Sequence, residues 1–120
     1  MTASALALSA LFSTEGFATI GGETVIGGLH GPEQHDHHCG HCFSWLFTRV
    51  QGFDHVVNVW ATMFDDTTWF VPFLETATGD RLACTSFPAR RTYPSIPQAA
   101  AFADRPTDYA AWDPTSFEET

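Results

Sequence analysis

The sequence predicts a mainly β protein with one short helix near its C-terminal end. Short runs of β-branched and aromatic residues recur along the chain and are separated by glycines and acidic turns. Eleven Phe, four Trp and two Tyr among 120 residues suit antiparallel sheets packed through aromatic rings. Four prolines between residues 94 and 114 leave space for only one short helix in the last part of the chain.

Five short strands are expected in the first half of the chain. They are short runs bounded by turn residues, and the clearest of them alternate apolar with polar or small residues. The Gly21-Gly22 pair is typical of a hairpin turn between the second and third runs. The five expected strands cover residues 5–12, 17–20, 23–27, 35–38 and 44–49.

Two more strands and a helix are expected in the second half. Residues 55–61 are β-branched and alternate, which makes them the clearest strand, and residues 69–77 form another. The helix is expected at residues 98–103, started by Pro97. The length allows one compact domain over residues 1–120, with residues 115–120 frayed.

The net charge excludes two classes of partner. The chain has no lysine, and five basic residues stand against 14 acidic ones, for a formal charge of −9. Neither nucleic acid nor an anionic membrane is an expected partner, because both require a basic surface. The sequence has no apolar run of membrane-spanning length and no basic segment typical of a signal peptide. Three cysteines without an export signal predict a reducing cytoplasm.

The segment Cys39-Gly40-His41-Cys42, called the knuckle below, specifies chemistry through both residue type and spacing. Two thiols separated by two residues can point at one cation, as in zinc knuckles. We therefore predict Cys39 and Cys42 as metal ligands and zinc as the cofactor. Structural zinc takes four ligands, so the knuckle supplies half of a site. The third cysteine, Cys84, lies far along the chain and is expected to be a buried or idle thiol.

Histidines near the knuckle are candidates for the missing ligands, since neutral imidazole binds zinc well. Neighbouring residues on a strand point to opposite faces, so a site within one chain would be strained. A second chain giving its own two cysteines would complete four-coordination and make a homodimer. For any single histidine, a solvated polar loop is the simpler interpretation. The candidates are His35, His37, His38 and His41.

Two other interpretations of the knuckle remain open. A redox dithiol usually opens a helix after a buried strand, whereas residues 43–49 alternate and are aromatic-rich, as in a strand. The cysteines could also have no shared role. Arg49 could bind a carboxylate, although a surface ion pair is the simpler expectation. Several aromatic residues could line a small-molecule pocket, although filling a core is the commoner use of such residues: Trp45, Phe47, Trp60, Phe64, Trp69, Phe70 and Phe73.

The knuckle and its flanks resemble the glutathione-dependent formaldehyde-activating enzyme family, which includes centromere protein V. The similarity is carried first by CGHCFSWLFTR at residues 39–49 and by VNVWATMFDD at residues 57–66. It continues through PFLET at residues 72–76 and, more weakly, through YPSIP at residues 93–97. The resemblance covers most of the chain from residue 3 to about residue 97.

The resemblance implies a β-tent of small antiparallel sheets around zinc. Family members carry an early Cys-x-Cys, a middle Cys-x-Cys-x-x-Cys and a late Cys-x-x-Cys motif. This chain matches only the late pair, Cys39 and Cys42, so it resembles the C-terminal part of the family domain. The middle trio, which in the family holds a second zinc linked to catalysis or to glutathione, has no match here. No catalytic residue is therefore carried over.

The implied activity is that of a carbon–sulfur lyase that forms S-hydroxymethylglutathione, with glutathione or another small thiol adduct as the partner. We expect this activity to be impaired here, because two of the three cysteine motifs are missing. The alternative is a non-enzymatic zinc-stabilised module that binds a partner or its own copy. Strand edges left open by the missing section favour that self-association.

Overall fold

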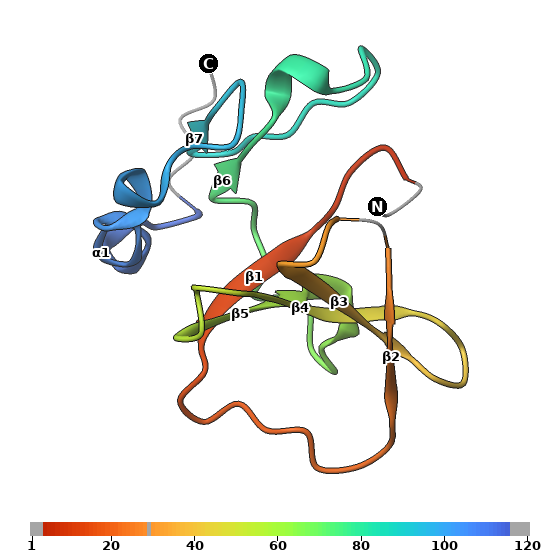
Figure 1. Ribbon diagram of the computed structural model, residues 1–120. Helices are drawn as coiled ribbons and strands as arrows, with labels where there is room; N and C mark the ends of the chain where they lie inside the picture. The colour runs from red at the N-terminus through yellow and green to blue at the C-terminus, as the bar shows by residue number, and fades with distance from the viewer. Residues whose placement is uncertain (1–3, 29, 116–120) are drawn as a thin grey trace. The chain divides into compact units, whose positions relative to one another are not determined.

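The computed structural model describes residues 4–28 and 30–115 and confirms a mainly β fold with one short C-terminal helix (Figure 1). Two compact units form, one from residues 1–69 and one from residues 70–120. Residues 115–120 were expected to be frayed, and of these, residues 116–120 lie outside the described part of the chain.

The first unit is built on one five-stranded sheet in which all neighbouring strands are antiparallel. The first strand of the sequence pairs with the fifth. The second to fifth strands pair in sequence order, each with the next, as hairpins (Figure 1). The two edge strands are therefore the first and the second. In spatial order the strands are β1 (Ser9–Ser13), β5 (Val56–Trp60), β4 (Trp45–Val50), β3 (Gln34–Cys39) and β2 (Thr24–Gly27).

One face of this sheet is apolar. Val57 of β5 is fully buried and lies opposite Phe12 of β1, so both side chains point to the same face. The Phe12 ring packs against Phe64, with 5.6 Å between ring centroids, and Phe64 packs against Trp69 at 5.2 Å. Ala61 is also buried and begins the short 3₁₀ helix η1 (Ala61–Met63). This small cluster is the core of the unit.

The other face of the sheet is polar at its centre. Asn58 lies opposite Thr48, and Thr48 lies opposite Asp36, so one row of polar side chains crosses β5, β4 and β3. An irregularity of register lies between His37 and His38, where Leu46 of β4 has no opposite partner. This extra residue is a β-bulge. As a result Trp45 pairs with His38 and joins the polar face.

The strand predictions are confirmed within one or two residues at 23–27, 35–38, 44–49 and 55–61. The strand predicted at 5–12 begins only at Ser9 and extends to Ser13. The strand predicted at 17–20 was wrong, and with it the hairpin turn at Gly21-Gly22. Because β1 pairs with β5, the segment between β1 and β2 has no neighbouring strand, and Ile20 is fully exposed.

The second unit contains a two-residue parallel pair, β6 (Leu74–Glu75) with β7 (Arg91–Thr92), and a short 3₁₀ helix, η2 (Thr78–Asp80). The strand predicted at 69–77 was therefore too long, because only residues 74 and 75 find a partner. Phe73 packs against Tyr109 and Trp112, with ring centroids 5.5 and 5.2 Å away. These rings form the apolar centre of the unit.

The helix lies later than predicted. Residues 98–103 contain only a 3₁₀ turn, η3 (Ala99–Phe102), and the α-helix is α1 (Arg105–Ala111). Pro106 stands in the first turn of α1, where the missing N–H costs nothing. Arg105 and Arg91 both form ion pairs with Asp108 on this helix. Pro106 was expected to interrupt regular structure, whereas it stands in the first turn of the helix.

Candidate functional site

The knuckle closes the hairpin between β3 and β4. Cys39 is the last residue of β3, and its N–H donates to the Ser44 carbonyl at 2.9 Å. The Phe43 N–H donates back to the Cys39 carbonyl at 2.9 Å. Phe43 has φ of 59°, a left-handed conformation that a side chain rarely adopts and that this tight turn requires. Cys42 lies inside the turn, so both thiols belong to one compact loop.

Local hydrogen bonds favour the thiolate form of Cys42. The His41 backbone N–H donates to Cys39 Sγ at 3.4 Å, and Cys42 Sγ lies 3.2 Å from the Ser44 hydroxyl. Hydrogen bonds to the side chain and backbone of Ser44, and then to Cys39, lower the pKa of the Cys42 thiol. A thiolate is the form that binds a soft cation or attacks an electrophile.

Two of the four candidate histidine ligands, His37 and His38, are engaged elsewhere. His37 Nδ1 lies 2.9 Å from Thr24 Oγ1, and its ring stacks on Phe47 with centroids 4.4 Å apart. His38 Nδ1 lies 3.1 Å from the Asp36 carbonyl oxygen. His41 is exposed at the tip of the turn. Within residues 4–28 and 30–115, no group of three or more His, Cys, Asp or Glu is arranged to hold a metal ion.

The environment of His37 favours the neutral imidazole. Burial against Phe47 is the main cause of its lowered pKa, and the nearby His35 and Arg49 lower it further. His35 itself is exposed on β3. Neutral imidazole is the ligand form, but the ring nitrogen Nδ1 of His37 is occupied by Thr24. The knuckle therefore presents two thiol donors without a histidine gathered around them.

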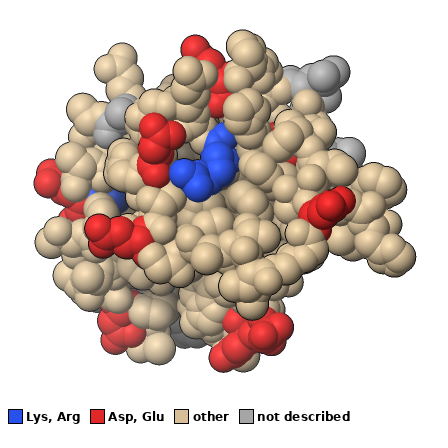
Figure 2. Space-filling view, turned by 60° about the horizontal axis from the view of Figure 1, so that its bottom comes forward, with Lys and Arg blue, Asp and Glu red and all other residues tan. Residues whose placement is uncertain are grey.

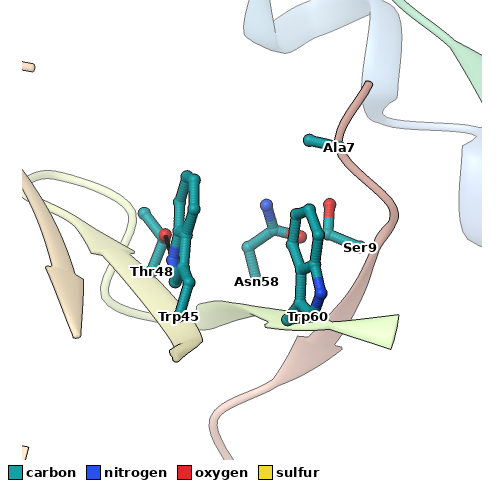
Figure 3. Close-up of a pocket in the computed structure, with 6 residues that line it drawn as sticks. All are labelled: Ala7, Ser9, Trp45, Thr48, Asn58 and Trp60. Carbon is teal, nitrogen blue, oxygen red and sulfur yellow. Dashed lines mark hydrogen bonds between the residues drawn. The ribbon is translucent and has the colours of Figure 1, made fainter. Parts of the chain in front are cut away.

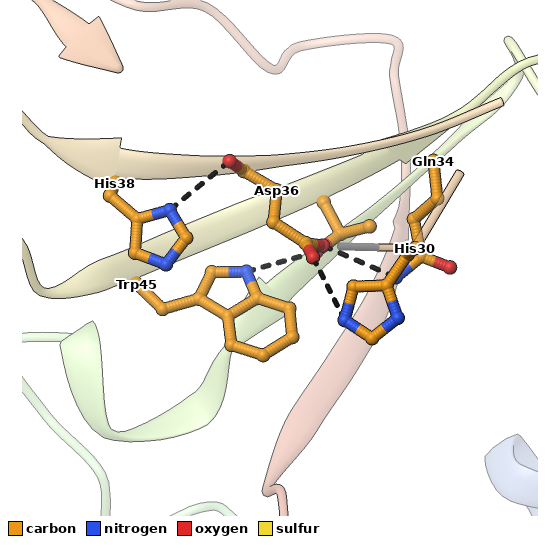
Figure 4. A network of polar contacts seen from close by, with 6 residues as sticks. His30, Gln34, Asp36, His38 and Trp45 are labelled. Atoms are coloured by element: carbon orange, nitrogen blue, oxygen red, sulfur yellow. Dashed lines mark hydrogen bonds and ion pairs between the residues drawn. The ribbon is translucent and has the colours of Figure 1, made fainter. Parts of the chain in front are cut away.

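A buried carboxylate that was not predicted from the sequence lies on the polar face of the sheet (Figure 4). Asp36 is only 1% exposed. Its Oδ1 accepts hydrogen bonds from Thr48 Oγ1 at 2.6 Å and from Gln34 Nε2 at 3.3 Å. Its Oδ2 lies 3.2 Å from His30 Nε2. Trp45 Nε1 donates to Thr48 Oγ1 at 2.9 Å, which extends the network across β4.

The alternation of side chains along β3 could have revealed this carboxylate. Asp36 has the same parity as Gln34 and His38, and it lies opposite Thr48. The sequence interpretation concerned only the histidines of this run and gave Asp36 no role. The structure places His30 and the Trp45 indole beside the Asp36 carboxylate (Figure 4).

A small cavity lies beside this network, with a volume of about 40 Å³ (Figure 3). Two of the aromatic residues that could have lined a pocket, Trp45 and Trp60, do so. Their rings are nearly parallel, at 15°, with centroids 5.6 Å apart. Phe47 and Phe64 instead pack against other rings of the first unit. The cavity is lined by Ala7, Ser9, Trp45, Thr48, Asn58 and Trp60.

The remaining candidate residues have ordinary surroundings. Arg49 donates to the Asp54 carbonyl oxygen at 3.2 Å rather than forming the expected ion pair among the residues described. Cys84 is exposed, so it is not the buried thiol that was one of its two expected states.

On the face that Figure 2 shows, the charged side chains do not gather into a basic patch. On the face in Figure 2, acidic side chains lie apart from one another around a central basic group. Among the described residues, Arg81 pairs with Glu75 at 3.5 Å, and Arg91 pairs with Asp108 at 2.9 Å. Among the helices of the described chain, none has the length and hydrophobicity needed to cross a membrane.

Comparison with known proteins gives no relative: no family model, no curated protein and no solved structure matches this chain.

Proposed function

We propose that this chain is a zinc-binding protein in which Cys39 and Cys42 hold the ion as thiolates. The observation that supports the proposal is the geometry of the turn. Both thiols lie on one hairpin loop, and the His41 N–H donates to Cys39 Sγ at 3.4 Å. A backbone N–H aimed at sulfur stabilises the negative charge that a zinc ligand must carry. The lowered pKa of Cys42 supports the same assignment.

The resemblance to formaldehyde-activating enzymes supplies a reaction class for this proposal. Zinc in such a site supports carbon–sulfur bond chemistry because it stabilises a thiolate near neutral pH. The residues of this chain would have two roles in the site. Cys39 and Cys42 would coordinate the ion, and the β3–β4 hairpin would fix the distance between them. We propose a structural ion with impaired lyase activity toward glutathione and formaldehyde. A reducing cytoplasm would keep both thiols free for the metal.

The metal content of purified protein tests the ligand assignment. The wild-type chain should retain zinc after dialysis, and the Cys39→Ser/Cys42→Ser variant should lose at least nine-tenths of it, because a serine hydroxyl is a poor zinc ligand. Elemental analysis of dialysed samples measures the ratio of zinc to protein.

Cys84→Ser is the matched control, since it removes an exposed thiol outside the knuckle. It should keep the wild-type zinc content. Equal zinc in the wild type and the double variant would rule out Cys39 and Cys42 as the ligands.

A second prediction concerns lyase activity. The zinc-loaded chain should show no turnover of glutathione and formaldehyde above the uncatalysed rate, because catalytic zinc needs three protein ligands and an open position. The described residues supply two thiols in one place. Formation of the adduct can be followed by NMR. A rate that scales with protein concentration and disappears in the double serine variant would instead restore the enzyme assignment.

A specific observation favours self-association as a second candidate function. Cys39 pairs in register with Thr24 of the edge strand β2. On that strand Val25 and Ile26 are 41% and 57% exposed. Half of a zinc site thus lies next to an open strand edge with apolar side chains. A second copy of the chain could complete the zinc site with two further thiolates and pair its own strand with the open edge of β2.

A further inference from the structure

The two thiols of the knuckle differ in their access to solvent. Cys42 lies in the turn and is exposed, whereas Cys39 ends strand β3 and is half-buried. Cys42 Sγ lies 3.2 Å from the Ser44 hydroxyl, and Cys39 Sγ accepts from the His41 backbone N–H at 3.4 Å. A small molecule in solution therefore meets the Cys42 sulfur first. We call Cys42 the outer thiol and Cys39 the inner thiol.

The hairpin holds the outer and inner thiols close together. Only two residues separate the cysteines, and the Cys39 side chain hydrogen-bonds the Cys42 thiol. The Phe43 N–H donates to the Cys39 carbonyl at 2.9 Å, which closes the turn. The Gly40 N–H donates to the Glu23 carbonyl at 3.2 Å, which fixes the turn to the residue before β2. The two sulfurs can thus join within the turn while the strands stay paired.

Adjacent thiols of unequal access are suited to thiol–disulfide exchange. The rate of the first exchange step depends on the access to the attacking sulfur, which favours the outer thiol. A second sulfur within reach then displaces the group that the first has taken up. Cys84 is also exposed, but it lies in the second unit, and Cys42 is the nearest cysteine to it in the sequence. The knuckle is therefore where a bond within one chain is expected.

We propose that the knuckle is a redox switch in which a small-molecule disulfide oxidises Cys39 and Cys42 to a disulfide and thereby abolishes zinc binding. This inference rests on the proposed zinc site, because the same two sulfurs serve both states. Zinc binds the thiolate, and a sulfur in a disulfide carries no negative charge to offer it. The zinc-bound state and the disulfide state therefore exclude each other.

Two exchange steps complete the oxidation. The Cys42 thiolate attacks one sulfur of the small disulfide, whose S–S bond breaks, so that a mixed disulfide forms at Cys42 and one small thiolate leaves. The Cys39 thiolate then attacks Cys42 Sγ, which breaks the mixed disulfide and releases the second small thiolate. The two cysteines lose two electrons in total, and the small disulfide gains both. The two small thiolates carry away the negative charges of the cysteines, so atoms, electrons and charge balance.

The small ring that closes around Gly40 and His41 makes the switch reversible. A disulfide across two residues departs from the preferred geometry, and strained, exposed disulfides are reduced more readily than structural ones. Its outer sulfur lies at an exposed position, where a small thiol can attack it. Excess small thiol should therefore reopen the bond and restore both zinc ligands.

Oxidised glutathione, added to the purified zinc-loaded chain, tests the switch. Cys84→Ser is the background, because Cys84 is an exposed thiol that would form its own adduct. The intact mass should fall by two hydrogen atoms per chain with no glutathione attached, and peptide mapping should place the bond between Cys39 and Cys42. A zinc indicator should report the loss of the bound ion in step with the change in mass. Excess reduced glutathione should reverse the change in mass.

Single variants in the same background identify the role of each thiol. Cys39→Ser should stop at the mixed disulfide, so that its mass rises by one glutathionyl group on Cys42. Cys42→Ser keeps only the half-buried inner thiol, and it should form an adduct at least about tenfold more slowly than Cys39→Ser, because access limits the exchange. Zinc content measured before the oxidant is added tests the proposed function separately. A chain that binds zinc but forms no disulfide would refute the switch alone.

Three results would overturn the switch. The first is that Cys39 and Cys42 both stay free in excess oxidised glutathione after a chelator has removed the zinc. The second is a mixed disulfide that persists on Cys42 although Cys39 is present, which would mean that the inner thiol does not reach it. The third is a disulfide that joins two chains, visible as a doubled mass under non-reducing conditions.

Discussion

Replacing Asp36 with alanine should lower the free energy of unfolding by about 3 kcal/mol, a large part of the stability of a domain this small. The carboxylate is 1% exposed and is the shared acceptor for Thr48 and Gln34, with His30 3.2 Å from its second oxygen. Its removal leaves these donors without an acceptor in a site that water does not reach. Urea unfolding followed by tryptophan fluorescence measures the change.

Further variants separate the effect of losing the hydrogen bonds of Asp36 from the effect of losing side-chain volume. Asp36→Asn keeps an acceptor for Thr48 and should cost about 1 kcal/mol. Asp65→Ala removes an exposed turn carboxylate and should change stability by less than about 0.5 kcal/mol. A double-mutant cycle with Thr48→Val should show coupling, because the two side chains share a 2.6 Å hydrogen bond. If Asp36→Ala were as stable as Asp65→Ala, the buried network would have no structural role.

Adding zinc should convert the chain from a monomer to a dimer, with a mass of twice 13.2 kDa, at a ratio of one ion to two chains. Each copy supplies two thiolates, and tetrahedral zinc takes four. Removing the ion with a chelator should restore the monomer, because metal binding and assembly are then one equilibrium. Light scattering during a zinc titration measures mass and stoichiometry together.

The double serine variant should remain a monomer at every zinc concentration, and Cys84→Ser should dimerise as the wild type does. A ratio of one zinc to one monomeric chain would contradict a zinc ion shared between two chains, and it would indicate that all ligands come from the same chain. A dimer that forms equally well with chelator present would show that the exposed β2 edge, rather than the ion, drives assembly.

The strands that could be predicted were those in which alternation and pairing agree. Residues 55–61 and 44–49 alternate clearly and find antiparallel neighbours on both sides. Residues 17–20 also have strand-like composition, but propensity cannot form a strand without a neighbour. Among the described residues β2 stays an edge strand, and the sheet gains β1 at its other edge, where it pairs with β5 far along the sequence. Such long-range pairing leaves no local signal.

The same distinction applies to the sites. Cys39 and Cys42 are close in sequence, so their spacing alone indicated a shared role. Asp36 and Asn58 are ordinary residues until the sheet places Thr48 between them. Two strands must pair in one register before either side chain is buried or faces a cavity. The candidate metal site could therefore be read from the sequence, and the polar row could not.

The bulge at Leu46 changes the face of the sheet to which the side chains on the knuckle side of β4 point, relative to the rest of the strand. This one unpaired residue turns Trp45 onto the face that holds Thr48 and Asp36. Strict alternation would put Trp45 and Thr48, which are three positions apart, on opposite faces of the sheet, so the indole owes its hydrogen bond with Thr48 to this extra residue. Deleting Leu46 alone would leave the indole two positions from Thr48 and on the same face. In any lineage of related chains, a tryptophan three residues before this threonine should therefore occur together with the bulge, and a tryptophan two residues before it should occur without one.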